Sequence, residues 1–347
     1  MAADRERAVF PMTPAVSVIL PARDAAATLP AALDSLRGQT LREIEILVID
    51  DGSTDATPDI ARRAASDDPR VIPIRASGCG IVAALNQGIA AATAPHIARM
   101  DADDISHPER LARQKAHLDA CADAGLVGCR VAFGGDAVAS RGYALHVDWI
   151  NGLLKPEEIS LHRFIESPFA HPSVMFRREL PARHGGYREG PFPEDYELWL
   201  RWLGAGVKMA KLPEELLVWN DPPARLSRTD ARYSKEAFFR LKAEYLARWL
   251  AKHNPRHPEI MTWGAGRLAR RRAEMLLPHG IQIVSHVDIA PRLIGRRAVG
   301  RPVVHPDEIP RDAFVVVFVA SRGARDLIRA RLEAGGRAMG KDFILAA

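Results

Sequence analysis

An alternation of short apolar runs with helix-forming segments constrains the fold more than any other feature of the chain. The runs at residues 16–20 and 44–49 are rich in β-branched residues, and each is followed by a turn and a helical pattern. Such alternation predicts parallel strands joined by crossover helices that cover both faces of a sheet. We therefore predict a doubly wound, mostly parallel α/β sheet that binds ligands beyond the carboxyl ends of its strands.

The same pattern predicts how the 347 residues are organised. Further strands are expected at 71–74, 96–100, 126–133 and 171–176, and helices at 28–36, 54–65, 81–92, 108–120 and 194–203. A long amphipathic helix at 233–252 precedes a second alternation, with strands at 260–263, 281–287 and 314–320. We predict a first α/β domain at 1–235, a connecting helix at 236–255, and a smaller Rossmann-like α/β accessory domain at 256–347.

Composition excludes several classes of protein. Hydrophobic residues make up 47% and charged residues 26%, which is typical of a globular chain and not of a disordered or fibrous one. The net charge of +5 comes from interleaved basic and acidic residues, and we expect no nucleic-acid partner. Three cysteines without CxxC spacing predict neither a disulfide framework nor a zinc site. No apolar run approaches the roughly 20 residues of a membrane span, so we expect a cytoplasmic protein, with peripheral attachment to the inner face of the membrane as an alternative.

Acidic residues follow the strand at 96–100. Asp101, Asp103 and Asp104 would repel one another at the end of a buried strand unless a cation balanced them. This arrangement predicts Mg²⁺ or Mn²⁺, which can neutralise the charge of a leaving nucleoside diphosphate. The alternative is an acidic cap for the helix near Pro108, which accounts for one of these acids but not for three.

A second acidic pair, Asp50 and Asp51, ends the strand at 44–49 and is expected to face the same crevice. An ionised carboxylate there accepts a hydrogen bond from the imide N–H of uracil or thymine, although turn formation and helix capping are the simpler interpretation of each acid alone. A third pair, Glu194 and Asp195, begins an apolar helix, and either caps it or supplies a general base for an acceptor hydroxyl. Arg225 lies in a loop long enough to close over a diphosphate.

Taken in order, these segments resemble the family-2 glycosyltransferases of the GT-A fold. The resemblance covers about residues 14–235 and rests on six motifs. They are Val16-Ser17-Val18-Ile19-Leu20-Pro21-Ala22, Val48-Ile49-Asp50-Asp51-Gly52-Ser53-Thr54-Asp55, Ala84-Leu85-Asn86-Gln87-Gly88, Met100-Asp101-Ala102-Asp103-Asp104, His171-Pro172-Ser173-Val174-Met175 and Pro193-Glu194-Asp195-Tyr196-Glu197-Leu198-Trp199.

The resemblance implies an inverting transfer from a nucleoside-diphosphate sugar, commonly uridine-linked, to a saccharide or lipid-linked acceptor in envelope polysaccharide synthesis. It makes Asp195 the catalytic base and Asp101 and Asp103 the DxD pair, with Asp103 as the direct metal ligand. Arg23 stands where many relatives have an aromatic residue or Asn. The residues expected to bind the donor nucleotide are Pro21, Ala22, Arg23, Asp51, Asn86, Asp101 and Arg225, and those expected to contact the acceptor or shape the site are Glu194, His171 and Trp199.

The C-terminal region carries an incomplete dinucleotide fingerprint. Gly264-Ala265-Gly266 follows a predicted strand and precedes a helix, and Asp288 ends the next strand. The alternatives are a tight turn in an accessory domain that forms homo-oligomers, and contact of Arg267 to Arg272 with an anionic lipid surface.

Other functions remain open at this stage. A nucleotidyltransferase normally has a Gly-rich basic loop after its first strand, where this chain has Pro21-Ala22-Arg23-Asp24-Ala25. A catalytically inactive sugar-nucleotide-binding module is disfavoured by the presence of Asp103 and Asp195. A dinucleotide-dependent oxidoreductase centred on Gly264 lacks recognisable substrate machinery.

Overall fold

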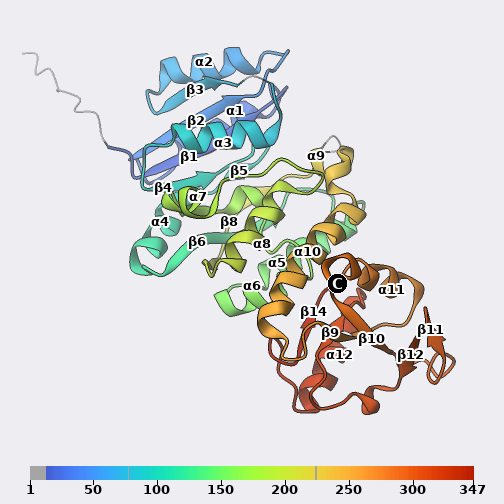
Figure 1. Cartoon of the computed structure of the whole chain (residues 1–347). Helices are drawn as coiled ribbons and strands as arrows, with labels where there is room; N and C mark the ends of the chain where they lie inside the picture. Colours follow the sequence, from blue (N-terminus) through green and yellow to red (C-terminus); the bar gives the residue numbers. More distant parts are fainter. Residues whose placement is uncertain (1–12, 77, 223–224) are drawn as a thin grey trace, which may run out of the picture. The chain divides into compact units, whose positions relative to one another are not determined.

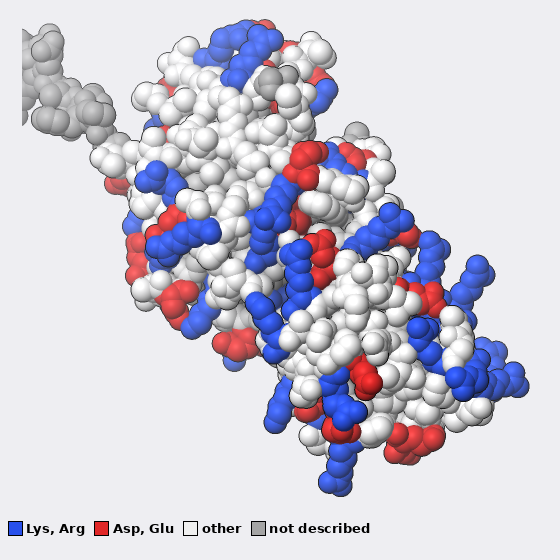
Figure 2. All heavy atoms as spheres, viewed as in Figure 1, with Lys and Arg blue, Asp and Glu red and all other residues white. Residues whose placement is uncertain are grey.

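The computed structural model describes residues 13–76, 78–222 and 225–347 (Figure 1). Contacts between Cα atoms divide the chain into two compact units. The first unit comprises Met1–Leu154, Phe169–Arg188 and Val207–Pro222, and the second comprises Lys155–Pro168, Glu189–Gly206 and Pro223–Ala347. Figure 2 shows Lys and Arg side chains distributed among Asp and Glu over the visible face, in line with the interleaved charges of the sequence.

The first unit contains an eight-stranded sheet in the order β3-β2-β1-β4-β7-β6-β8-β5. β3, β2, β1 and β4 are parallel neighbours, as are β6 and β8, while β7 and β5 run antiparallel to their neighbours. The predicted mostly parallel α/β sheet is therefore confirmed. Its strands are β1 (Val16–Ala22), β2 (Ile44–Asp50), β3 (Val71–Arg75), β4 (His96–Arg99), β5 (Ile105–Ser106), β6 (Ala124–Phe133), β7 (Met175–Arg177) and β8 (Lys208–Trp219), and its helices are α1 (Leu29–Arg37), α2 (Thr57–Asp67), α3 (Ile81–Ala91), α4 (Arg110–Ala120), α5 (Arg141–Asn151) and α7 (Glu179–His184).

The centre of this sheet is buried on both faces, which explains its continuous apolar strands. Every residue of β1 and of β2 is buried, as is typical of parallel strands covered by helices. On one face α3 lies very close to β1, because a Cβ atom at Gly88 would be 2.5 Å from Cγ2 of Ile19. A side chain at residue 88 would therefore push α3 away from the sheet.

Two parts of the first unit differ from the prediction. The strand expected at 171–176 begins with a 3₁₀ turn, His171–Ser173, and only Met175–Arg177 is strand. β8 was not predicted, because Pro213 and the two acids after it interrupt its apolar pattern. The pairing of β6 with β8 shifts register between Leu212 and Glu215. This irregularity accommodates a proline inside a strand.

The second unit contains a six-stranded sheet in the order β11-β12-β10-β9-β13-β14, parallel except for β11. Its strands are β9 (Glu259–Trp263), β10 (Gln282–Val287), β11 (Arg297–Ala298), β12 (Arg301–Val304), β13 (Val315–Val317) and β14 (Phe343–Leu345). Its helices are α6 (Pro156–His162), α8 (Glu194–Gly204), α9 (Leu226–Thr229), α10 (Lys235–His253), α11 (Arg267–Glu274) and α12 (Arg322–Ala334), and single 3₁₀ turns lie at Ala231–Tyr233, Leu277–His279 and Pro306–Glu308.

Helices α8 and α10 share one hydrophobic core with this second sheet. Tyr196 and Leu200 of α8, Leu250 of α10, Phe314 and Ile344 all belong to it. α10 thus groups with the C-terminal sheet by its contacts, whereas we expected it to be a connecting helix. The predicted domain boundaries, after residue 235 and after residue 255, stay a prediction. None of the described helices is long and apolar enough to cross a bilayer.

We predict that His286 makes the second unit less stable in acid. His286 of β10 is completely buried and its Nδ1 lies 2.7 Å from Thr262 Oγ1. Burial, followed by Arg301 and Arg270, lowers its pKa from 6.5 to about 4. Between these two values the unfolded chain binds more protons, so stability falls as pH falls.

The His286→Asn variant keeps a hydrogen-bonding group but does not titrate. Thermal unfolding measured at pH 7 and at pH 4.5 gives the free energy of unfolding lost on acidification. This loss should be smaller for the variant than for the wild type, by up to about 3 kcal/mol. If the variant and the wild type lost the same free energy of unfolding, His286 would not be the group that makes the second unit less stable in acid.

Candidate active site

The loops that follow β1 and β2 are joined by hydrogen bonds at the carboxyl edge of the sheet. Asp24, with φ of 47°, accepts from the backbone N–H of Thr54 at 2.8 Å and donates its own backbone N–H to Ser53 Oγ at 3.0 Å. The backbone N–H of Ala26 donates to Asp55 Oδ2 at 2.9 Å. These bonds order the expected nucleoside loop, a role that we did not predict for Asp24 or Asp55.

Asp50 and Asp51 perform different tasks. Asp50 Oδ1 accepts from the backbone N–H of Ser53 at 3.1 Å, which is the turn-forming role given as the simpler interpretation. Asp51 has a side chain only 6% exposed, and its two oxygens accept from the backbone N–H of Gly80 at 3.2 and 3.0 Å. Arg23 Nη1 lies 3.8 Å from Asp51 Oδ2. Asp51 is thus fixed between the start of α3 and the loop after β1.

Pro21 and Ala22, the other predicted members of this loop, end β1 and are buried. The carbonyl of Ala22 accepts from the backbone N–H of Asp51 at 2.9 Å. Their main chain therefore positions Asp51.

The predicted acidic cluster is assembled by the fold. Asp101, Asp103 and Asp104 each offer a carboxylate oxygen, and these atoms all lie within 4.8 Å of one another. Asn220, directly after β8, braces the cluster: its backbone N–H donates to Asp104 Oδ1 at 2.8 Å, and its Nδ2 donates to the carbonyl of Asp103 at 2.6 Å. No sequence pattern predicted Asn220 as part of the site. Only recognition of β8 could have placed it at the same sheet edge.

Two buried arginines lie beneath the acidic cluster. Arg99, 4% exposed, forms an ion pair with Asp101. Burial opposes the charge of Arg99, but the attraction and hydrogen bond of Asp101 outweigh it and raise its pKa. Burial lowers the pKa of Arg110 to about 10, an effect that Cys129 and Asp104 oppose, so Arg110 remains charged at neutral pH. Arg99 and Arg110 thus balance part of the negative charge of the three carboxylates, which we expected a metal ion alone to balance.

Arg110 also connects several segments around the cluster. Its Nε donates to Ser106 Oγ at 2.8 Å, and its Nη1 donates to the carbonyls of Arg99 at 3.1 Å and Pro172 at 2.5 Å. These bonds join α4, β5, the end of β4 and the His171–Ser173 turn.

His171 and Asn86 both contact Tyr187. His171 is 8% exposed, and its Nε2 lies 2.7 Å from the hydroxyl of Tyr187. Burial, and secondarily Arg99, holds the pKa of His171 well below its usual range, so the ring is neutral. Asn86 donates Nδ2 to the carbonyl of Tyr187 and accepts from its backbone N–H, both at 2.9 Å. Asn86 therefore positions the chain at Tyr187, and its contact with a nucleotide stays a prediction.

The remaining candidates lie in the second unit. Glu194 is the first residue of α8, is 3% exposed, and accepts from the hydroxyl of Tyr233 at 2.6 Å. Asp195, the next residue, is only partly buried. Trp199 is completely buried, and its role at the site stays a prediction. Arg225 directly precedes α9 and is partly buried.

Comparison with known proteins tests the predicted family. The model of the family described as Glycosyl transferase family 2 matches residues 17–184. The chain is 32% identical over 195 residues to the amylovoran biosynthesis glycosyltransferase AmsE of Erwinia amylovora, across 54% of this chain and 69% of that protein. It is 35% identical over 170 residues to the succinoglycan biosynthesis protein ExoO of Rhizobium meliloti, across 48% of this chain and 44% of that protein.

A solved structure supports the same conclusion for the fold. S. aureus TarS 1–349, in complex with UDP, matches 68% of this chain and 72% of its own length with a TM-score of 0.51 and 19% identity. At that identity the match concerns the fold alone. Together with the sequence matches, it confirms the predicted resemblance: this chain belongs to glycosyltransferase family 2 and is a glycosyltransferase with the GT-A fold.

Proposed function

We propose that this glycosyltransferase moves a sugar from a nucleoside-diphosphate sugar, expected to be uridine-linked, to a saccharide or lipid-linked acceptor, with inversion. The observation that carries the proposal is the acidic cluster after β4, where the buried Arg99 pairs with Asp101, in the same sheet whose strand β2 is directly followed by Asp51. Relatives named for amylovoran and succinoglycan biosynthesis support a role in envelope polysaccharide synthesis.

The acidic cluster fits a divalent cation. Its donors are hard carboxylate oxygens, all within 4.8 Å of one another, as Mg²⁺ and Mn²⁺ prefer. Asp101 is engaged by Arg99, and Asp104 by the backbone of Asn220. In the proposal Asp103 is the main ligand and Asp101 the second, as the resemblance to the family's DxD pair implies. A bound cation neutralises the charge of the leaving diphosphate.

Asp51 recognises the base of the donor. Its buried carboxylate is fixed by Gly80 and accepts the imide N–H of uracil. Arg23 is 59% exposed beside it and supplies a cation for the ribose or phosphate side of the nucleotide. In the proposal Arg225 binds the diphosphate.

Asp195 is the general base. Its carboxylate takes the proton of an acceptor hydroxyl while that oxygen attacks the anomeric carbon from the face opposite the diphosphate. The bond between the anomeric carbon and the diphosphate oxygen breaks, and its electron pair leaves with the diphosphate. Of the two acids at the start of α8, Glu194 is 3% exposed and accepts from the hydroxyl of Tyr233, whereas Asp195 is only partly buried, which supports Asp195 as the base.

We predict that Asp103→Ala abolishes metal-dependent donor binding, because the cluster loses its main ligand. Calorimetry with UDP-sugars in the presence of Mn²⁺ should show at least a tenfold weaker affinity. Asp123→Ala is the control, since Asp123 is exposed, lies outside the acidic cluster and pairs with Lys208 at 2.5 Å. Wild-type affinity in the Asp103 variant would overturn the metal assignment.

Asp195→Asn should lower turnover by about 100-fold or more while donor affinity stays unchanged, because the amide cannot accept the proton. Glu194→Gln, which retains an oxygen for Tyr233, should lose much less activity. Steady-state transfer assays on both variants decide between the two acids. A larger loss in Glu194→Gln would make Glu194 the base.

Asn220→Ala tests the brace between β8 and the acidic cluster. Removal of the side chain breaks its bond to the carbonyl of Asp103, worth about 1 kcal/mol. The Mn²⁺ concentration for half-maximal activity should rise several-fold, with little change in the thermal unfolding midpoint. An unchanged Mn²⁺ requirement would show that the brace has no influence on the metal site.

A further inference from the structure

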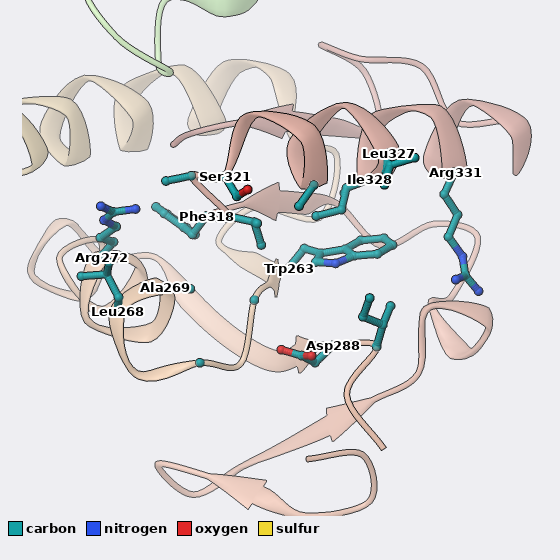
Figure 3. Close-up of a pocket in the computed structure, with 16 residues that line it drawn as sticks. Trp263, Leu268, Ala269, Arg272, Asp288, Phe318, Ser321, Leu327, Ile328 and Arg331 are labelled. Carbon is teal, nitrogen blue, oxygen red and sulfur yellow. The ribbon is translucent and has the colours of Figure 1, made fainter. Parts of the chain in front are cut away.

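The second unit has a cavity of its own, which the proposed transfer reaction does not use. Its volume is about 540 Å³, and it lies beyond the carboxyl ends of β9, β10 and β13 (Figure 3). The volume falls within the range of small-molecule sites. Its lining includes Trp263, Leu268, Asp288, Ile289, Phe318 and Leu327.

The topology places this cavity where the strand order reverses. β9 is flanked by β10 on one side and by β13 on the other, and all three are parallel. The chain runs outward from β9 through β10 to β12, and then crosses to β13 on the opposite side. In open parallel sheets, ligands bind in the crevice at this point.

The turn after β9 leaves room for a ligand to approach the backbone. Gly264 has φ of 115°, and a Cβ atom there would lie 2.7 Å from Cβ of Ala269 in α11. Glycine therefore allows the turn and α11 to pack closely. At Gly266, which caps α11, a Cβ atom would meet nothing within 4 Å. Gly264 thus allows close packing of the turn against α11, and Gly266 leaves space for a ligand to approach the backbone.

Two helices begin at the cavity, and neither has an acidic residue in its first turn to balance the positive end of its dipole. Gly266 caps α11 and Ser321 caps α12, and both residues line the cavity. Among the described residues no side chain caps either helix. The backbone N–H groups and dipoles of two helix starts favour an anionic group such as a phosphate.

Asp288 adds a different requirement on the ligand. Its Oδ2 accepts from the backbone N–H of Ala265 at 2.8 Å and its Oδ1 from that of Ala290 at 2.9 Å, so it braces the glycine turn. The same carboxylate lines the cavity below Trp263 (Figure 3). Each oxygen retains acceptor capacity. A carboxylate repels phosphate but accepts hydrogen bonds from neutral hydroxyls such as those of ribose.

We propose that the second unit binds a nucleoside 5′-phosphate. Its base lies against the apolar side chains of Trp263, Ile289 and Leu327, its ribose hydroxyls donate to Asp288, and its phosphate meets the N–H groups at the start of α11. The combination of an apolar slot, a hydroxyl acceptor and an anion-binding helix start selects this ligand class over a lipid chain, which would use only the first of the three.

Gly266 offers a sharp test with a matched control. Gly266→Asp and Gly266→Asn both introduce a favoured helix-capping residue into open space at φ of −68°, so neither should disturb folding. Only the aspartate adds a negative charge where the phosphate is expected. Both substitutions are made in the full-length chain carrying Asp103→Ala, with EDTA present, so that the donor site does not contribute.

Calorimetry with AMP, ADP, NAD⁺ and UDP then measures binding. We expect at least one of these to bind the parent chain and Gly266→Asn with similar affinity, and Gly266→Asp at least tenfold more weakly. Adenosine, uridine and inorganic phosphate should each bind more weakly than the intact nucleotide. The proposal is overturned if none of the four nucleotides binds the parent chain, or if the two substitutions weaken binding equally. Neither result bears on the proposed sugar transfer, which uses other residues than those that line this cavity.

Discussion

The balance between three carboxylates and two buried guanidiniums at the end of β4 is the interaction on which the first unit depends. Arg99 has almost no exposed surface, and a buried unpaired charge of this kind costs several kcal/mol. Asp101 supplies its partner. Arg110 donates to the backbone carbonyls of Arg99 and Pro172. The two arginines therefore position the main chain and also balance the charge of the acids. One negative charge in excess remains on the three acids, and the proposed divalent cation would balance it.

The site around this cluster is organised largely by main-chain contacts. Gly80 orients Asp51, Asn220 orients Asp103 and Asp104, and Asn86 holds the backbone of Tyr187. Such groups lose little conformational freedom when a ligand binds, because the fold has already ordered them. The loops of the proposed donor site are thus ordered by hydrogen bonds within the protein itself.

The second unit links the proposed base to the C-terminal sheet. α8, which begins with Glu194 and Asp195, packs through Tyr196 and Leu200 into the same core as Phe314 and Ile344. The buried ion pair of Glu197 with Arg201 at 2.9 Å, and the hydroxyl of Tyr245 at 2.5 Å from Glu197, hold α8 further. The C-terminal sheet therefore also has a structural role, since it packs against the helix that contains Asp195.

The sequence by itself determined the buried strands β1 and β2, the helices between them, and the acids at their carboxyl ends, because these depend on local apolar periodicity and turn residues. It also indicated the glycine turn after β9. Only the tertiary structure decided that Asp50 forms a turn while Asp51 meets Gly80, and that Arg99, Arg110 and Asn220 surround the acidic cluster. Asn220 is 117 residues from Asp103 and follows a strand hidden by Pro213. Pairing over such a separation leaves no periodic signal in the chain, so the partners of a charged group become known only when the sheet has closed.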